Sequence, residues 1–293
     1  MDQVVLRKPG WLTIRPPNNS DKVNSIKENL KKFNLHTVCG ESHCPNIAEC
    51  WSSGTATFMV MGDTCTRGCR FCNVKTKYIG ATLDKDEPKK LANAVKNLEL
   101  DYIVVTSVDR DDLEDYGSGH FAECIKELKK NKIMVEVLIP DFKGNYDCIK
   151  RIVDSKPNVI AHNIETVKRL QKKVRDPRAN YEQSLKVLKT IKEMDKNIFT
   201  KSSIMLGLGE EDDEVIETMK DLRNISVDFL TLGQYLRPSK RHLDVVDYVH
   251  PDKFKLFEVK GKELGFKYVA SGPFVRSSYK AGEFFVKSML KRM

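Results

Sequence analysis

Six of the eight cysteines lie within 34 residues, between Cys39 and Cys72, at spacings that could hold metal. Cys65, Cys69 and Cys72 form the pattern C-x3-C-x2-C in the segment GDTCTRGCRFCNV. Three thiolates at this spacing can bind three irons of a 4Fe–4S cluster and leave the fourth iron without a protein ligand, because no fourth cysteine completes a ferredoxin pattern. Zinc is the competing metal, but structural zinc usually takes four ligands in two pairs, and no second pair lies at the expected distance.

A second triplet, Cys39-x4-Cys44-x5-Cys50, lies just upstream in VCGESHCPNIAECW. Three more thiolates so close together indicate a second cluster that is again one protein ligand short, although some of them could be incidental loop cysteines. Cys124 and Cys148 lie in helical patterns among apolar neighbours, which predicts buried structural cysteines.

The composition is that of an ordinary globular chain of 293 residues, with 40% hydrophobic and 31% charged residues. Lys and Arg exceed Asp and Glu by 50 to 41, a net charge of +9, which indicates either a solvated basic surface or an acidic partner. The basic residues are spread along predicted helices rather than gathered in one arm, so we expect no nucleic acid partner.

We also expect no membrane partner, because no run of 18 apolar residues exists. The first residues lack a signal or transit pattern, which predicts a cytoplasmic protein and leaves a processed organellar form open. In such a compartment thiols stay reduced, so metal explains the cysteines better than disulfides do.

Apolar runs rich in β-branched residues alternate with amphipathic stretches from Thr55 onward, which predicts a parallel sheet covered by helices. Six such units favour a partial (β/α)6 TIM-type barrel over a doubly wound sheet. We expect three parts: an N-terminal Cys-rich extension (1–54), the barrel (55–271) and a C-terminal tail (272–293). The predicted strands are 56–62, 102–108, 133–139, 158–163, 199–206 and 229–235, with a further one at 266–271. The predicted helices are 22–33, 88–98, 119–130, 145–155, 165–173, 180–194 and 211–224.

The C-x3-C-x2-C loop after a first barrel strand resembles the radical S-adenosylmethionine superfamily. Within this superfamily, the arrangement of two adjacent cysteine triplets resembles that of the lipoyl synthase family. The tail sequence Arg276-Ser277-Ser278-Tyr279 is similar to a motif of the same family. Further segments with this resemblance, such as VTSVDRDDLEDYGSGHF and LTLGQYLRPSKRHLDV, extend it over nearly the whole chain.

The resemblance implies a reaction and two clusters. The open iron of the first 4Fe–4S cluster would bind S-adenosylmethionine, and an electron would release a 5′-deoxyadenosyl radical. That radical would abstract hydrogen from C6 and then C8 of a protein-bound octanoyl-lysine, so two S-adenosylmethionine molecules are used per product. A second, auxiliary 4Fe–4S cluster would give up the sulfur. A serine of the tail motif would be its fourth ligand, and we assign this role to Ser278, with Ser277 as the alternative.

Several polar residues at predicted strand ends would then contact S-adenosylmethionine, because reactive groups of such barrels lie at that edge. Thr106, Ser107 and Asp109 could bind the methionine ammonium group, unless Asp109 caps a helix. Asn163 and Glu165 suit ribose hydroxyls, unless Glu165 lies in the first turn of a helix. Arg178 could hold a carboxylate, although an exposed arginine is the default for this residue type.

The resemblance also implies partners. They are octanoylated lipoyl domains or a glycine-cleavage carrier protein, a flavodoxin- or ferredoxin-type reductant, and an iron–sulfur carrier that rebuilds the auxiliary cluster. Lipoyl domains tend to be acidic, so the positive net charge could attract them. The alternatives are a biotin-synthase-like sulfur insertion enzyme, an electron-transfer or cluster-scaffold protein and a zinc-binding structural protein.

Overall fold

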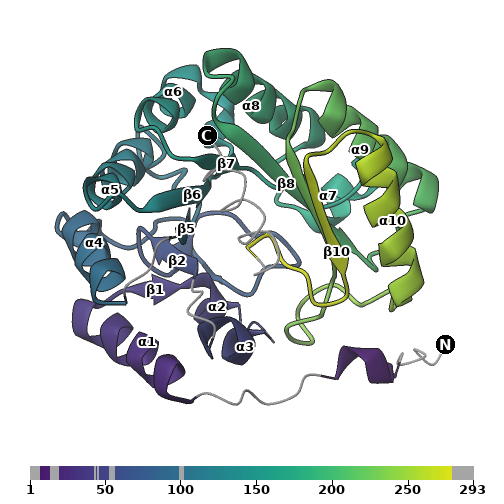
Figure 1. Cartoon of the computed structure of the whole chain (residues 1–293), viewed down its shortest axis with the longest axis horizontal. Coiled ribbons are helices and arrows are strands. Elements are labelled where there is room, and N and C mark those ends of the chain that lie inside the picture. The colour runs from purple at the N-terminus through teal and green to yellow at the C-terminus, as the bar shows by residue number, and fades with distance from the viewer. Residues whose placement is uncertain are drawn as a thin grey trace.

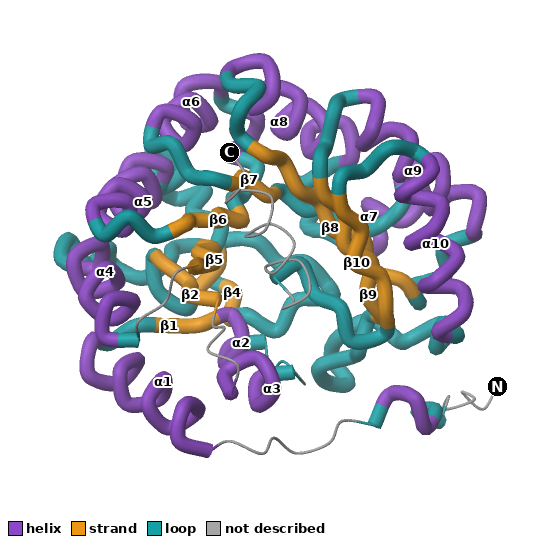
Figure 2. The backbone as a smooth tube through the Cα atoms, viewed as in Figure 1, coloured by secondary structure: helices purple, strands orange, loops and turns teal. Residues whose placement is uncertain are grey.

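An eight-stranded sheet forms the centre of the computed structural model, which describes residues 7–13, 20–42, 44, 46–52, 57–98 and 102–278. The strand order is β1-β2-β5-β6-β7-β8-β9-β10; β1 is antiparallel to β2, and the remaining neighbours are parallel. The strands form a curved sheet and the longer helices lie on its outer side, as Figures 1 and 2 show. The predicted partial barrel is therefore confirmed. The strands are β1 (His36–Thr37), β2 (Thr57–Val60), β5 (Tyr102–Ser107), β6 (Met134–Leu138), β7 (Val159–Ala161), β8 (Phe199–Leu206), β9 (Phe229–Gln234) and β10 (Tyr268–Gly272).

Each predicted strand and helix has a counterpart among the described residues, within a few residues of its expected bounds. The first residue of the predicted strand 56–62 and the residues after 278 lie outside the described part of the chain. The longer helices are α1 (Ser20–Phe33), α4 (Glu87–Asn97), α5 (Ser118–Lys130), α6 (Tyr146–Asp154), α8 (Tyr181–Met194), α9 (Asp212–Asn224) and α10 (Pro251–Glu263). The short ones are η1 (Gly10–Leu12), α2 (Val38–Glu41), α3 (Ile47–Ser52), η2 (Phe142–Gly144), η3 (Lys168–Leu170) and α7 (Gln171–Val174).

Two parts of the fold differ from the expectation. The cysteine-rich stretch is not only a loop, because it contains β1 and the two short helices α2 and α3, which are too short for hydrophobic periodicity to reveal. Helix α10 was not predicted either. The His250 side chain accepts a hydrogen bond from the backbone of Asp252, and Pro251 occupies the first helical position, so the helix start is encoded locally.

The N-terminal segment shares its hydrophobic core with the barrel. Ile26, Leu35 and Trp51 belong to the same cluster of buried side chains as Phe58 and Ile103 of the first two barrel strands. The segment before residue 54 therefore packs as a layer on the barrel, which fixes the positions of its cysteines.

A buried ion pair lies inside the barrel. Lys201 Nζ of β8 lies 2.7 Å from Glu136 Oε1 of β6, and both side chains are almost completely buried. The Tyr102 hydroxyl of β5 donates to the other oxygen of Glu136. The carboxylate thus has two partners, as a charge in this position requires.

Candidate active site

The loop with the C-x3-C-x2-C pattern leaves the sheet through two residues with left-handed backbone. Met61 has a φ of 68° and Gly62 a φ of 84°, and a Cβ at Gly62 would lie 2.9 Å from the Ala81 Cβ. Glycine is therefore required at this turn. Cys65 lies on the short strand β3 (Thr64–Cys65), which pairs with β4 (Lys75–Thr76), and the other two cysteines lie between them. The loop thus places its cysteines beyond the C-terminal end of β2.

Backbone N–H groups donate hydrogen bonds to the cysteine sulfurs of this loop, including one from Val74 to Cys72. The Asp109 amide lies 3.3 Å from Cys65 Sγ, and the Asp176 amide lies 3.3 Å from Cys69 Sγ. Burial raises the pKa of the Cys65 and Cys69 thiols to about 12 and that of Cys72 to about 11. Thiolates in such a place need a bound cation, and hydrogen bonds to cysteine sulfurs are a feature of iron–sulfur sites. The donor set fits a cluster with three cysteine ligands, and the role of each residue stays a prediction.

Arg67, between the first two cysteines, fixes this loop to the ends of β5 and β6. Its Nη1 and Nη2 donate to the two carboxylate oxygens of Asp141 at 2.8 and 2.7 Å, and its Nε and Nη2 donate to Asp111 at 2.9 and 3.0 Å. The Arg67 side chain is 3% exposed and that of Asp141 is fully buried. Burial alone would raise the pKa of Asp141, but the hydrogen bonds and charge of Arg67 outweigh it and hold that pKa at about 2.

Two polar oxygens near the loop are buried without a partner among the described residues, Ser107 Oγ and Asn163 Oδ1. Asn163 Nδ2 donates to Glu165 Oε1 at 3.1 Å. Burial raises the pKa of Glu165, and its carboxylate is near enough to Cys72 to raise the pKa of that thiol as well. Buried polar groups normally have partners, so these residues fit a polar ligand beside the cysteines, such as the ribose and amino groups of S-adenosylmethionine.

The other predicted contacts already have protein partners. The Thr106 hydroxyl donates to the Leu138 carbonyl at 3.0 Å. Asp109 Oδ1 lies 3.4 Å from the Arg67 guanidinium, and burial is the main cause that raises the pKa of Asp109 to about 6. Arg178 makes a bidentate pair with Asp176 at 2.8 and 2.9 Å, so its guanidinium already holds a carboxylate. The roles of these three residues toward a ligand stay predictions.

The alternative roles considered for two of these residues are not realised. Asp109 does not cap a helix, because the helix that follows it, α5, begins at Ser118 with Gly117 in the N-cap position. Glu165 is outside a regular first turn; it has a φ of 68° and forms an isolated bridge with Ile204 of β8. Its backbone is therefore bound to the barrel edge, which fixes its side chain close to Cys72.

The second triplet lies on the cysteine-rich segment, with Cys39 on α2 and Cys50 on α3. Cys39 and Cys50 are each 9% exposed. Burial raises the pKa of Cys39, and hydrogen bonds from the backbone and hydroxyl of Thr57 act in the opposite direction. Thr57 Oγ1 also forms a hydrogen bond with Ser278 Oγ at 2.8 Å, so one threonine joins this triplet to the tail.

Other interactions bring the tail to the same place. Asn46 Nδ2 donates to the Phe274 carbonyl at 2.6 Å. Burial lowers the pKa of Arg276, and the nearby Cys44 and Cys50 act in the opposite direction, which puts this guanidinium beside the triplet. The triplet, Arg276 and Ser278 are thus brought together. Tyr279 of the tail motif lies outside the described residues. Among the residues that the structure describes, the Ser278 side chain has a hydrogen-bond partner and the Ser277 side chain has none.

Glycine is needed where the tail crosses β9. A Cβ at Gly233 would lie 2.0 Å from the carbonyl oxygen of Val275. Backbone contact at this distance leaves no space for any side chain. Gly233 therefore sets how closely the tail approaches the barrel wall, which sequence reasoning did not anticipate.

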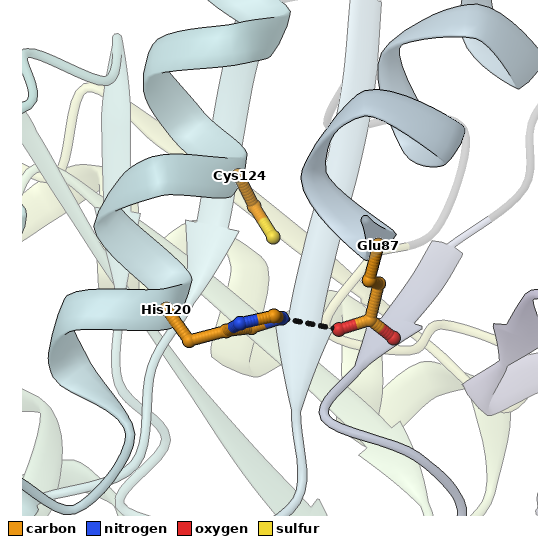
Figure 3. Close-up of side chains that lie close together, drawn as sticks. All are labelled: Glu87, His120 and Cys124. Carbon is orange, nitrogen blue, oxygen red and sulfur yellow. Dashed lines mark hydrogen bonds and ion pairs between the residues drawn. The ribbon is translucent and has the colours of Figure 1, made fainter. Parts of the chain in front are cut away.

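A buried group that the sequence did not reveal anchors the start of the cysteine loop. Glu87 Oε2 accepts the Met61 N–H at 2.9 Å and lies 2.6 Å from His120 Nε2, with Cys124 beside them (Figure 3). Cys124 is completely buried and Cys148 is 4% exposed, as expected for structural cysteines. His120 and Cys124 are four residues apart on α5, a spacing that could have indicated their shared helix face.

Comparison with known proteins places the chain among enzymes. A model of the radical SAM superfamily matches residues 59–222, which include the Cys65 loop. A curated mitochondrial lipoyl synthase of Culex quinquefasciatus is 58% identical over 297 residues, covering 99% of this chain and 78% of that protein. The lipoyl synthase of Halobacterium salinarum is 57% identical over 97% of this chain and 93% of its own length. An apicoplast lipoyl synthase of Plasmodium knowlesi is 54% identical over 98% of this chain and 65% of that protein.

Solved structures agree on the fold. A methylornithine synthase superposes with a TM-score of 0.54 at 12% identity, over 94% of this chain and 92% of that one. Streptococcus suis SuiB bound to S-adenosylmethionine superposes with a TM-score of 0.58 at 12% identity, over 78% of this chain and 54% of that one. None of the described helices is both long and apolar enough to cross a membrane.

Proposed function

The chain belongs to the lipoyl synthase family of radical S-adenosylmethionine enzymes, and on this premise we propose how its residues divide the family's reaction. That reaction inserts two sulfur atoms, at C6 and C8, into an octanoyl chain carried on a lysine. We propose that Cys65, Cys69 and Cys72 bind the cluster of the radical step. The auxiliary cluster is bound by Cys39, Cys44, Cys50 and Ser278. These four residues lie on the cysteine-rich segment and on the tail, which Thr57 joins. The observation that carries this assignment is the tail contact at Thr57.

At the first site, the bound cluster and S-adenosylmethionine supply the 5′-deoxyadenosyl radical that an unactivated C–H bond requires. The chain's own residues orient and enclose them. Ser107 Oγ and Asn163 Oδ1, two buried oxygens without a partner in the described part of the chain, would accept hydrogen bonds from the amino group and ribose. Glu165 adds a carboxylate next to Cys72. Arg67 holds the loop in place through Asp111 and Asp141.

The auxiliary cluster is a substrate in this proposal, because its sulfide ends in the product. Serine oxygen is a hard ligand and binds iron in a sulfur-rich cluster less well than thiolate does. A ligand of this kind at Ser278 gives the cluster one corner that opens readily. Each turnover uses two S-adenosylmethionine molecules and removes sulfur from the auxiliary cluster. An iron–sulfur carrier protein therefore has to rebuild this cluster before the next turnover.

The octanoyl chain comes on a carrier, for which we propose lipoyl domains or the glycine-cleavage carrier protein. Electrons come from a flavodoxin- or ferredoxin-type reductant. We propose a thiol-reducing compartment, either the cytoplasm or the interior of an organelle, in keeping with relatives named as mitochondrial and apicoplast enzymes.

The test is anaerobic. The reconstituted protein is incubated with an octanoyl-lysine peptide, S-adenosylmethionine and dithionite, and the peptide is read by mass spectrometry. We expect a gain of two sulfurs with 5′-deoxyadenosine formed alongside. Formation of 5′-deoxyadenosine without sulfur transfer would refute the substrate, and absence of both would favour an electron carrier.

Two neighbouring variants test the tail ligand. Ser278→Ala should abolish sulfur insertion and leave 5′-deoxyadenosine formation intact, because the radical site is separate. Ser277→Ala is the matched control and should retain both. The reverse pattern would move the ligand role to Ser277.

A further inference from the structure

Five exposed cationic side chains surround the outer face of the Cys65 loop, and we call them the basic rim. They lie on three segments: the loop between the cysteines, α7, and the connection after β9. Their side chains are exposed, and none of them forms an ion pair with another described residue. The basic rim consists of Arg70, Lys172, Lys173, Lys240 and Arg241.

The three segments are joined directly to each other. The Arg70 N–H donates to the Val174 carbonyl at 2.9 Å, and its Nη1 donates to the Lys173 carbonyl at 3.3 Å. On the other side, the Leu243 N–H donates to the Arg70 carbonyl at 3.3 Å. Arg70 is therefore the centre of the rim, with cations of α7 on one side and those before Leu243 on the other.

The same segments contact the proposed cluster ligands. His242 Nε2 lies 3.0 Å from the Cys72 carbonyl, and the Asp176 amide donates to Cys69 Sγ at 3.3 Å. Arg70 itself lies between these two cysteines in the chain, and the neighbouring Gly68 is exposed. The basic rim is thus the protein surface directly outside Cys69 and Cys72.

Several other exposed lysines of this protein have carboxylate partners on their own helix. Lys126 and Lys130 of α5 pair with Glu123 and Glu127, and Lys220 of α9 pairs with Glu217. Such pairs leave little net field at the surface. The side chains of the basic rim have no such carboxylate partner among the described residues, so this surface has a positive electrostatic potential that extends into the solvent.

We propose that the basic rim is the docking surface for an acidic protein that delivers single electrons to the cluster at Cys65, Cys69 and Cys72. The inference rests on the proposed assignment of that cluster. The donor, a protein with a flavin or an iron–sulfur centre, loses one electron, and the cluster gains it without any bond being formed. Electron transfer slows steeply with distance, so a donor has to dock where the cluster lies nearest the surface. Transient redox complexes have small interfaces and depend on charge steering, which a compact cationic patch provides.

The test compares two charge-reversed variants, K172E/K173E on α7 and K240E/R241E on the connection after β9. The matched control is K186E/K220E, which makes the same change in net charge at exposed lysines of α8 and α9. Each holoenzyme is mixed anaerobically with a reduced, acidic flavodoxin in a stopped-flow instrument, and cluster reduction is followed by its absorbance. This reading needs no octanoyl substrate, so it stays informative if the proposed product is not formed.

We expect both rim variants to lower the second-order rate constant at low salt by at least about ten-fold relative to the control. The rate for the unmodified enzyme and the control should fall as salt rises, whereas the rim variants should lose most of this dependence. Reduction by dithionite, a small molecule, should be the same in all four proteins.

Three results would overturn the proposal. One is a flavodoxin rate in both rim variants within about two-fold of the control. Another is a cluster-reduction rate that falls equally with dithionite and with flavodoxin in both rim variants, because this indicates damage to the cluster. The two variants change different segments, so if only one of them is damaged the other still tests the proposal. The third is an unchanged rate of cluster reduction by flavodoxin in the rim variants, together with a raised KM for an octanoylated carrier domain when dithionite is the reductant. This result would assign the basic rim to binding of the carrier.

Discussion

Replacing Arg67 by methionine should destabilise the protein far more than removing an exposed arginine does. The guanidinium is 3% exposed and compensates the fully buried carboxylate of Asp141 as well as Asp111. Removal of one partner of a buried ion pair costs about 3–5 kcal/mol, because the remaining charge has no compensation. The matched control is Arg169→Met, whose side chain is 53% exposed in its pair with Glu214 and should cost less than about 1 kcal/mol.

The pH dependence gives a second, independent reading. In the unmodified protein the pKa of Asp141 is about 2, below its ordinary value, so its ionised form stabilises the fold at neutral pH by roughly 2.5 kcal/mol. That contribution is present above about pH 4 and is lost as the pH falls toward 2. Without Arg67, burial raises the pKa of Asp141 above its ordinary value. The penalty of Arg67→Met should therefore be largest near neutral pH and smaller at about pH 5, where the carboxyl takes up a proton.

The assay is urea unfolding of the cluster-free protein, followed by far-UV circular dichroism at about pH 7 and about pH 5. Arg67→Lys should lose less than the methionine variant, because it keeps the charge but cannot form two bidentate pairs. Two outcomes would refute the reasoning: a loss for Arg67→Met no larger than that for Arg169→Met, or a penalty that grows as the pH falls.

Three further predictions follow from the site. Cys39→Ala should lower the iron content from about eight to about four per chain and abolish sulfur insertion, with 5′-deoxyadenosine still formed in the anaerobic assay; an unchanged iron content would contradict a ligand role. Gly233→Ala places a Cβ about where the Val275 carbonyl lies, so the tail must shift and sulfur insertion should fall while S-adenosylmethionine cleavage persists; equal loss of both would show a wider disturbance. Glu87→Ala leaves the buried Met61 N–H without its acceptor and should cost about 1–3 kcal/mol in urea unfolding, whereas Glu123→Ala on the exposed face of α5 should cost little.

The sequence predicted the barrel well because most of its strands contain runs of apolar, β-branched residues, such as residues 103–105. Phe199–Leu206 and Tyr102–Ser107 are buried along almost their whole length, as a sheet covered by helices on its outer side requires. Helix α10 escaped prediction because its buried apolar residues Phe254 and Phe257 stand among charged residues, and the apolar Leu256 and Val259 lie on its exposed side. Strand β1 escaped because two residues are too few to show a period of two.

Some residues of the candidate site could be predicted from the sequence and others could not. Cysteine spacing is a local property, so both triplets could be read from the chain. The partners of Arg67 and Glu87 could not, because Asp141 and Met61 meet them only through the arrangement of strands and helices. Arg178 shows the converse: the residue type suggested a carboxylate partner, and the structure supplies one from two positions earlier in the chain, Asp176.

The tail contact has a consequence for biosynthesis. The hydrogen bonds Asn46 to Phe274 and Thr57 to Ser278 join residues 228 and 221 positions apart in the chain. During translation the N-terminal segments emerge and fold first. Cys65, Cys69 and Cys72 are therefore made and can come together on the nascent chain well before Ser278 is added. The ligand set proposed for the auxiliary cluster is completed later than that of the radical site, although its three cysteines come first in the chain.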